Sequence, residues 1–424
     1  MKSHLYNKNK LLTKNKCNLC KSDKMELIIS VDKQPIANRF LKFTDEYEYK
    51  HPKKLGLCLN CGLVQLIAPV PVEELASKFN WIRYNEPEDH LNDLANKLAH
   101  LNGITRKSVI GAISYKDASL QERLDNTGFK NNWLINPENH LNIKNKSAGI
   151  ETIQSQLSFP LDEERIKHLS KADILLVRHI LEHAHNIHPF VSALKRMINK
   201  SGYMVFEVPC CDNQIEKFDY SMIWEEHISY FTPATFRKFF DLSGLTLVHF
   251  ERIHYQLEDA LIGIATINNA IVPHKKTCPP NAFSVSKNEF QLAKKYGSFY
   301  DPYLLKLKRY LSNITKNVGK IAIFGAGHMA TTFINIFDIG SLLEFAIDDN
   351  PNKIGLFMPG SLLPIRPLQA LITENIKVCL LAVNPALEEK AIAKLNAFTN
   401  NKGFFLSIYH NSQYAWNQNS RELN

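Results

Sequence analysis

The sequence lacks any segment that could cross a membrane or direct secretion. No apolar run approaches the ~18 residues of a spanning helix, and the longest, around Val378–Val383, is typical of a buried strand. The first residues, Met1–Lys16, are rich in lysine and asparagine and contain no apolar core, so we expect no secretory signal. They also lack the arginine and serine enrichment of a transit peptide. We therefore expect a cytoplasmic protein with no membrane partner.

The sequence also lacks the clustered positive charge of a nucleic-acid-binding protein. The formal net charge is +9, but the lysines are scattered and no basic stripe with interleaved aromatic residues occurs. We expect no nucleic-acid partner, and a basic balance of this kind suits an anionic small molecule such as a nucleotide diphosphate. With 45% hydrophobic and 22% charged residues, the 424-residue chain has the composition of a globular protein of two or three domains.

Cysteine is scarce, and its spacing does not indicate a disulfide framework. Of the eight cysteines, Cys210 and Cys211 are adjacent, whereas Cys278 and Cys379 are isolated. The remaining four form two CxxC pairs near the N-terminus. Without a secretory signal, this distribution favours metal binding in a reducing compartment.

The two CxxC pairs predict a zinc site. Thiolates bind zinc tetrahedrally, and two CxxC turns supply a closed shell of four sulfurs with no open position, which is typical of a structural site. In the second pair, Gly62 permits the tight turn that such a site needs. The alternative is two unrelated pairs of buried or redox-active thiols. The predicted ligands are Cys17, Cys20, Cys58 and Cys61.

The order of expected elements divides the chain into four parts. Residues 1–90 form a small β-rich zinc-binding lobe, and residues 91–270 alternate strands with helices, which predicts a doubly wound parallel sheet. A proline-containing linker and a helix follow in residues 271–317, and residues 318–424 form a second Rossmann-like α/β domain. In the second part, Thr232-Pro233 is typical of a helix start, with Thr as the N-cap.

A glycine-containing turn follows the first expected strand of the last part. It reads Gly325-x-Gly327-x-x-Ala330 and opens a helix, and Asp348 ends the next strand. Such a turn can hold a pyrophosphate at the helix N-terminus, with an acid for a ribose. Close helix–strand packing without a ligand is the alternative.

Three groups of residues, in this order, resemble the zinc-domain-containing class I S-adenosylmethionine (SAM)-dependent methyltransferases that C-methylate nucleotide sugars. The first is the pair of CxxC motifs around Pro35-Ile-Ala-Asn-Arg-Phe, ending in Cys58-x-x-Cys61-Gly-Leu-Val-Gln. The second is Trp224-Glu-Glu-His-Ile-Ser-Tyr-Phe, which is similar to the family's Tyr-His-Glu-His-x-Ser-Tyr-Phe. The third is the Gly325 turn with Asp348-Asp-Asn-Pro-x-Lys-x-Gly.

This resemblance implies an activity and roles for particular residues. The family removes a proton from a sugar carbon beside a 4-keto group, and the resulting enolate attacks the methyl group of SAM. The base would be His227, with Glu226 as its partner. The resemblance also implies further contacts. The cofactor would contact Ser114, Asp117, Asn136, Pro137, His179, Glu182 and His183, and the nucleotide-sugar substrate would contact Trp224, Tyr230, Gly325, Gly327 and Asp348.

The sequence departs from the family pattern around the cofactor. Gly111 stands where the first strand should end in an acid, Ala118 replaces a glycine, and Asn136 replaces the acid that grips the ribose. Trp224 replaces the motif tyrosine. Two alternatives therefore stay open: a catalytically degenerate protein that binds a sugar nucleotide, and an NAD-dependent enzyme that uses the Gly325 turn.

The segment His179-Ile-Leu-Glu182-His183 admits two interpretations. It resembles the strand-then-His-x-Leu-Glu-His pattern of class I methyltransferases, and it also spells the inverted zincin motif. The zincin motif needs both histidines on one long helix. Because an apolar strand immediately precedes His179, the methyltransferase interpretation is favoured.

Overall fold

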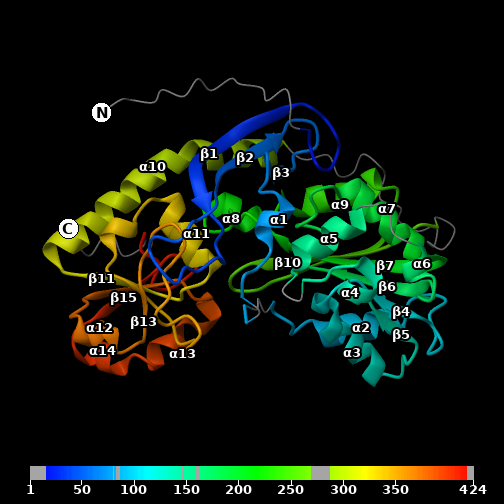
Figure 1. The fold of residues 1–424 in the computed structure, drawn as a ribbon. Helices are drawn as coiled ribbons and strands as arrows, with labels where there is room; N and C mark the ends of the chain where they lie inside the picture. Colours follow the sequence, from blue (N-terminus) through cyan, green and yellow to red (C-terminus); the bar gives the residue numbers. More distant parts are fainter. Residues whose placement is uncertain are drawn as a thin grey trace.

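The computed structural model describes residues 16–79, 81–82, 86–145, 148–158, 163–268 and 287–417. Three sheets organise them, and the small N-terminal sheet lies above and between two larger α/β units (Figure 1). Across these described ranges, no helix is long and apolar enough to cross a membrane. The prolines expected in the linker, around residues 270–285, lie outside the described residues, as does Cys278.

The N-terminal sheet contains a strand from the middle of the chain. Its order is β1 (Met25–Pro35), β2 (Lys50–Cys58), β3 (Val64–Leu66) and β8 (Ser229–Tyr230), all antiparallel. Strand β8 belongs to the Trp224–Phe231 motif, and its pairing with β3 sets Val64 opposite Tyr230. A short helix, α1 (Val72–Leu75), follows the lobe. The motif predicted to be catalytic is therefore hydrogen-bonded to the cysteine-containing lobe.

The middle unit confirms the predicted class I, Rossmann-like α/β fold. Its six strands run in the order β5 (Asn132–Leu134), β4 (Ile110–Ala112), β6 (Ala172–Arg178), β7 (Ile198–Cys210), β10 (Asp259–Thr266) and β9 (Thr246–Ile253). Strands β4 to β7 are parallel, but β10 is antiparallel to both of its neighbours. The prediction of a wholly parallel sheet was wrong at this strand, because a short turn joins β9 to β10 as a hairpin.

Helices cover both faces of this sheet. One face packs against α2 (Leu91–Ala99) and α3 (Ala118–Asn126), in a core that includes Leu98, Leu120 and Ile174. The other face carries the larger core, and Thr232 caps α9 there as expected. The helices that accompany this second core are α4 (Pro137–Leu141), α5 (Ile150–Ser158), α6 (Glu163–Ile166), α7 (Ile187–Met197) and α9 (Pro233–Leu242).

The C-terminal unit is a five-stranded parallel sheet. Its order is β13 (Ile365–Arg366), β12 (Ala346–Ile347), β11 (Ile321–Phe324), β14 (Val378–Leu381) and β15 (Phe404–Ser407). Its helices are α11 (His328–Ile336), α12 (Ala370–Thr373), α13 (Glu388–Ala393) and α14 (Asn396–Asn400). The long helix α10 (Lys287–Asn317) precedes it and packs on β1: a Cβ at Gly297 would lie 2.5 Å from the Ile28 carbonyl oxygen.

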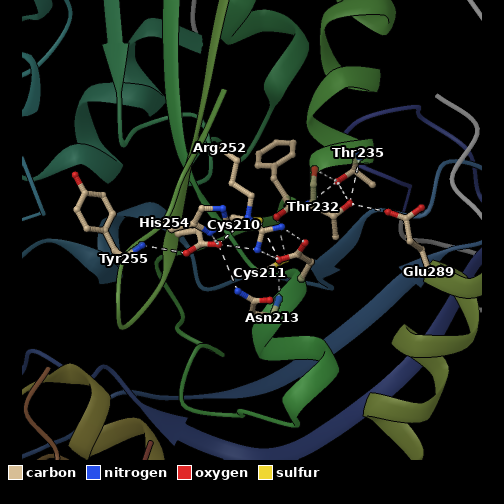
Figure 2. A network of polar contacts seen from close by, with 12 residues as sticks. Cys210, Cys211, Asn213, Thr232, Thr235, Arg252, His254, Tyr255 and Glu289 are labelled. Atoms are coloured by element: carbon tan, nitrogen blue, oxygen red, sulfur yellow. Dashed lines mark hydrogen bonds and ion pairs between the residues drawn. The ribbon is translucent and has the colours of Figure 1, made fainter. Parts of the chain in front are cut away.

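A polar network secures the end of β7 to its neighbours (Figure 2). The Arg252 guanidinium donates to Asp212, in helix α8 (Asp212–Lys217), at 2.7 Å and to Asp259 at 2.6 Å. Beside it, Thr232 donates to Glu289 of α10 at 3.4 Å. Burial raises the pKa of the Cys211 thiol well above its usual range, so this cysteine is an inert core residue. The network thus joins the middle sheet to α10.

Candidate active site

The four predicted zinc ligands lie together. Their Sγ atoms are all within 4.8 Å of one another, and the Cys17–Cys61 and Cys20–Cys58 pairs are each 3.5 Å apart. Tetrahedral bonds of ~2.3 Å place sulfurs about 3.8 Å apart, so the spacing suits zinc. Gly62 has φ +80°, as its predicted turn requires. The chain therefore has a zinc-binding lobe with a closed, structural cysteine site.

One residue of the zinc loop directly contacts the Trp224–Phe231 motif, which is predicted to be catalytic. Asn18 lies between the first two cysteines, and its side-chain amide donates to the Ala184 carbonyl at 2.7 Å and to Ser229 at 3.3 Å. Ala184 follows His183, and Ser229 lies two residues after His227. Strand β3 also hydrogen-bonds to the motif, because Leu66 N donates to Ile228 O at 2.9 Å. The zinc loop therefore positions both histidines.

His227 lies in a cluster of rings. Its ring centroid is 4.7 Å from that of His183 and 4.9 Å from that of Trp224, with the His183 ring nearly perpendicular. All three residues line one cleft. Burial and the neighbouring His183 hold the pKa of His227 well below its usual value. The imidazole is therefore neutral at neutral pH and able to accept a proton.

The Glu226 carboxyl contacts the zinc-binding lobe. Its Oε1 accepts a hydrogen bond from Asn38 Nδ2 at 2.7 Å, and its carboxyl lies within 4.8 Å of Glu151 and His183. Burial and the nearby Glu151 raise the pKa of Glu226 well above its usual value. Any influence of Glu226 on His227 would therefore pass through His183.

Tyr230, predicted to contact substrate, holds the shape of the motif loop. Its hydroxyl bridges the backbone of Trp224, donating to the carbonyl and accepting from the amide, at 3.1 Å each. It is buried and is not among the described residues that line the cleft. Trp224 itself does line the cleft.

The residues predicted around the cofactor are largely occupied by internal contacts. Both carboxylate oxygens of Asp117 accept backbone N–H groups, from Ile113 and Ser114 on one oxygen and from Arg178 on the other, at 2.8–2.9 Å. The Ser114 hydroxyl caps the short turn that follows β4. The Asn136 side chain accepts from Asn139 N at 2.8 Å as the N-cap of α4, where Pro137 is the first helical residue. These residues shape the loops at the carboxyl ends of β4 and β5.

Two of the departures at this edge have packing explanations. A Cβ at Gly111 would lie 2.4 Å from the Trp133 ring, so the indole occupies the space of a larger side chain. Asp117, rather than a glycine-rich backbone, holds the turn after β4, and burial raises the pKa of Asp117 to about 6.

His179 belongs to a buried ion network rather than to the cleft wall. Glu207 accepts from Arg178 Nε at 2.5 Å and pairs with His179 Nε2 at 3.1 Å. Burial alone would lower the pKa of His179, but Glu86 and Glu207 raise it to about 10. The charged imidazole therefore joins the ends of β6 and β7.

We expect Glu207→Gln to lower the stability of the chain substantially. The change removes the carboxylate that pairs with both buried cations, Arg178 and His179, and breaking such a buried pair costs about 3–5 kcal/mol. The midpoint of urea denaturation, followed by circular dichroism, should fall clearly below that of the wild type. Glu122→Gln, on the surface of α3, is the matched control and should not shift it. Equal midpoints for all three proteins would mean that the network contributes nothing.

The cleft suits a cationic cofactor. Glu86, Glu151 and Glu226 line it, together with Tyr115 and Lys116 of the turn after β4. Glu182 is buried close by, and its Oε2 has no hydrogen-bond partner within the described part of the chain. A sulfonium with an amino group would compensate this carboxylate. Of the seven residues predicted to bind cofactor, all of them described, His183 alone lines the cleft.

The C-terminal unit contacts Trp224, one of the residues that line the cleft, and carries the predicted glycine turn. Gly325 has φ +101°, and a Cβ there would lie 2.9 Å from the Ala382 carbonyl oxygen, so only glycine fits this turn. Asp348 accepts from Ala326 N at 2.9 Å and from Lys353 Nζ at 2.8 Å. Gly327 N-caps α11, with open space where a Cβ would be.

The first residue of α11, His328, contacts Trp224 of the motif that is predicted to be catalytic. The His328 ring centroid lies 4.3 Å from that of Trp224. Burial lowers the pKa of His328 to about 4, so this imidazole is neutral. Trp224 therefore contacts both His227 and the first residue of the helix that follows the glycine turn.

Sequence reasoning missed three residues that the structure places beside the cleft, Asn38, Glu151 and His328. Glu151 lies in α5 and pairs with His183 Nδ1 at 2.9 Å. The sequence marked Glu151 only as an acidic residue in the first turn of a helix, and the structure shows that its side chain is buried. Asn38 lies in the resemblance segment after Pro35, and nothing local marks it as a partner of Glu226.

Comparison with known proteins gives a consistent picture. Residues 17–75 match a zinc binding domain model, residues 146–250 a methyltransferase domain model and residues 288–408 a C-methyltransferase C-terminal domain model. The chain is 20% identical over 398 residues to the C-methyltransferase NovU of Streptomyces niveus, covering 92% of this chain and 94% of that protein.

Two solved structures resemble part of the chain. One is CalO1, a methyltransferase of calicheamicin biosynthesis in its S-adenosylhomocysteine-bound form, at 11% identity and TM-score 0.27, covering 42% of this chain and 54% of that one. The other is the B. subtilis tRNA methyltransferase TrmK, at 9% identity and TM-score 0.28, covering 61% of this chain and 97% of that one. At such scores these two similarities add nothing about substrate.

Proposed function

Because the chain belongs to the SAM-dependent methyltransferases that join a zinc-binding domain to a C-methyltransferase C-terminal domain, we propose that it methylates a ring carbon beside the 4-keto group of a nucleotide-linked deoxysugar. The observation that carries the proposal is the position of His227. This neutral imidazole lines a cleft between the zinc-binding lobe and the middle unit, next to acidic groups suited to a sulfonium.

In this proposal His227, Trp224 and His183 have different roles in the reaction. SAM, when bound, supplies an electrophilic methyl group. His227 accepts the proton from the ring carbon, and the electron pair moves toward the keto oxygen before it forms the new carbon–carbon bond. Trp224 covers the sugar, and His183 holds the imidazole of His227 by packing against it.

The C-terminal turn is proposed to hold the nucleotide diphosphate. Gly325 and Gly327 leave the N-terminus of α11 open, and a helix N-terminus favours phosphate. Asp348 uses its oxygens on Ala326, Asn350 and Lys353, which favours a scaffolding role over a ribose contact. This weakens the NAD alternative.

Binding and product analysis test the proposal. We expect S-adenosylhomocysteine to bind the zinc-replete protein one-to-one with micromolar affinity in calorimetry. Incubation with SAM and 4-keto-deoxysugar nucleotides should then give a product with a new carbon–methyl bond, assigned by NMR. Methyl transfer to oxygen or nitrogen, or no transfer to any keto-sugar nucleotide despite cofactor binding, would contradict the substrate class.

A further inference from the structure

A cluster in the cleft is built from two carboxyl groups and one imidazole. One oxygen each from Glu151 and Glu226 and one nitrogen of His183 lie within 4.8 Å of one another, and all three side chains are buried. They come from α5, from the motif loop and from the segment after β6, and all three line the cleft.

The neighbouring lysines already pair with other carboxylates. Lys116 lines the same cleft, and its Nζ donates to Glu86 Oε1 at 2.7 Å. The nearby Lys53 is already used, since its Nζ bonds Glu225 Oε2 at 3.0 Å and Ile223 O at 3.0 Å. The partner of Glu226 from the zinc-binding lobe is Asn38, a neutral amide. Two adjacent buried carboxylates need a proton or a cation, because buried charges are stable only when paired or bound to metal.

The contact between Glu151 and His183 has the geometry of neighbouring ligands rather than of a hydrogen bond. Glu151 Oε1 is 2.9 Å from His183 Nδ1, yet Nδ1 makes no hydrogen bond of acceptable geometry and is fully buried, within the described part of the chain. Ligands held ~2.1 Å from one ion lie about 3.0–4.2 Å apart, close to the observed spacing.

We propose that Glu151, His183 and Glu226 bind a divalent cation, distinct from the zinc of the cysteine site. Two carboxylates with one imidazole suit Mn²⁺ among the common ions. Three protein ligands leave coordination positions open toward the cleft, and His183 sets the ion beside the His227 ring.

The role of the ion in catalysis, described next, rests on the proposed methyl transfer to a keto-sugar carbon. The substrate keto oxygen takes an open position on the ion. When the ring C–H bond breaks, its proton goes to His227 and its electron pair forms an enolate whose oxygen the ion stabilises. That pair then forms the bond to the methyl carbon, and the carbon–sulfur bond breaks toward sulfur.

Titration of the zinc-replete protein with Mn²⁺ alone, without SAM or sugar, tests the site. We expect one Mn²⁺ per chain by calorimetry, with the zinc content unchanged at one. Glu151→Gln and Glu226→Gln should each weaken Mn²⁺ binding by about 100-fold. Glu122→Gln, on the exposed surface of α3 and outside the residues that line the cleft, is the matched control and should bind as the wild type does.

A spectroscopic measurement makes the test independent of variant folding. Pulsed EPR on the wild-type Mn²⁺ complex should detect one imidazole nitrogen. No Mn²⁺ binding at millimolar concentrations, no nitrogen coupling, or unaltered binding by both glutamine variants would overturn the proposal, and the two carboxyls would then share a proton. Because no substrate is present, such a failure leaves the methyl-transfer proposal standing, whereas failure of the keto-sugar assay leaves the Mn²⁺ result standing.

Discussion

The variant His227→Ala should lose about 10²–10⁴-fold in kcat, while its affinity for S-adenosylhomocysteine stays within a few-fold of the wild type. The imidazole lies 4.7 Å from the His183 ring and 4.9 Å from the Trp224 ring, and the variant removes the proposed proton acceptor without changing the turn after β4. Single-turnover methyl transfer and calorimetry measure the two quantities separately.

Two controls sharpen this comparison. His100→Ala changes an exposed histidine just past the end of α2 and should leave kcat unchanged. Exchange of the substrate ring proton with deuterated water, measured without SAM, should disappear in His227→Ala and persist in His100→Ala. If His227→Ala retains turnover and exchange, His227 is not the base, and His183 becomes the next candidate.

Loss of the structural zinc has the second large expected effect. Cys58→Ser and Cys61→Ser should each release the ion, because two CxxC turns provide its whole shell, and a structural zinc supplies about 10–16 kcal/mol of binding energy to the fold that holds it. The N-terminal sheet should then become sensitive to proteolysis. Zinc content by mass spectrometry and limited digestion measure both effects.

Methyl transfer should fall with the zinc, although no cysteine lines the cleft among the described residues. The reason is geometric: Asn18 in the zinc loop holds Ala184 and Ser229, and β3 holds β8. Cys278→Ser removes a thiol outside both pairs and should keep zinc and activity. Full activity in a zinc-free Cys58→Ser protein would show that methyl transfer does not depend on the zinc-binding lobe.

Local sequence patterns were enough to predict the zinc site and most of the helices and strands. Two CxxC pairs bring ligands together through short turns, so the spacing alone identified the four cysteines. Apolar periodicity identified strands such as β6 and helices such as α7, because burial on one face or both leaves a direct mark on the sequence. The N-cap role of Thr232 and the turn at Gly62 were also predictable, because each depends on neighbouring residues in the sequence.

The sequence by itself therefore determined the α/β class and the metal lobe, whereas the catalytic roles in the Trp224–Phe231 motif stay a prediction. Only the tertiary structure decided that β8 joins the zinc sheet, that β10 runs antiparallel, and that Asp117 and His179 serve internal networks. It alone brought Glu151 and Asn38 to Glu226. These are contacts between segments far apart in the chain, and no local pattern encodes which buried polar groups will satisfy one another.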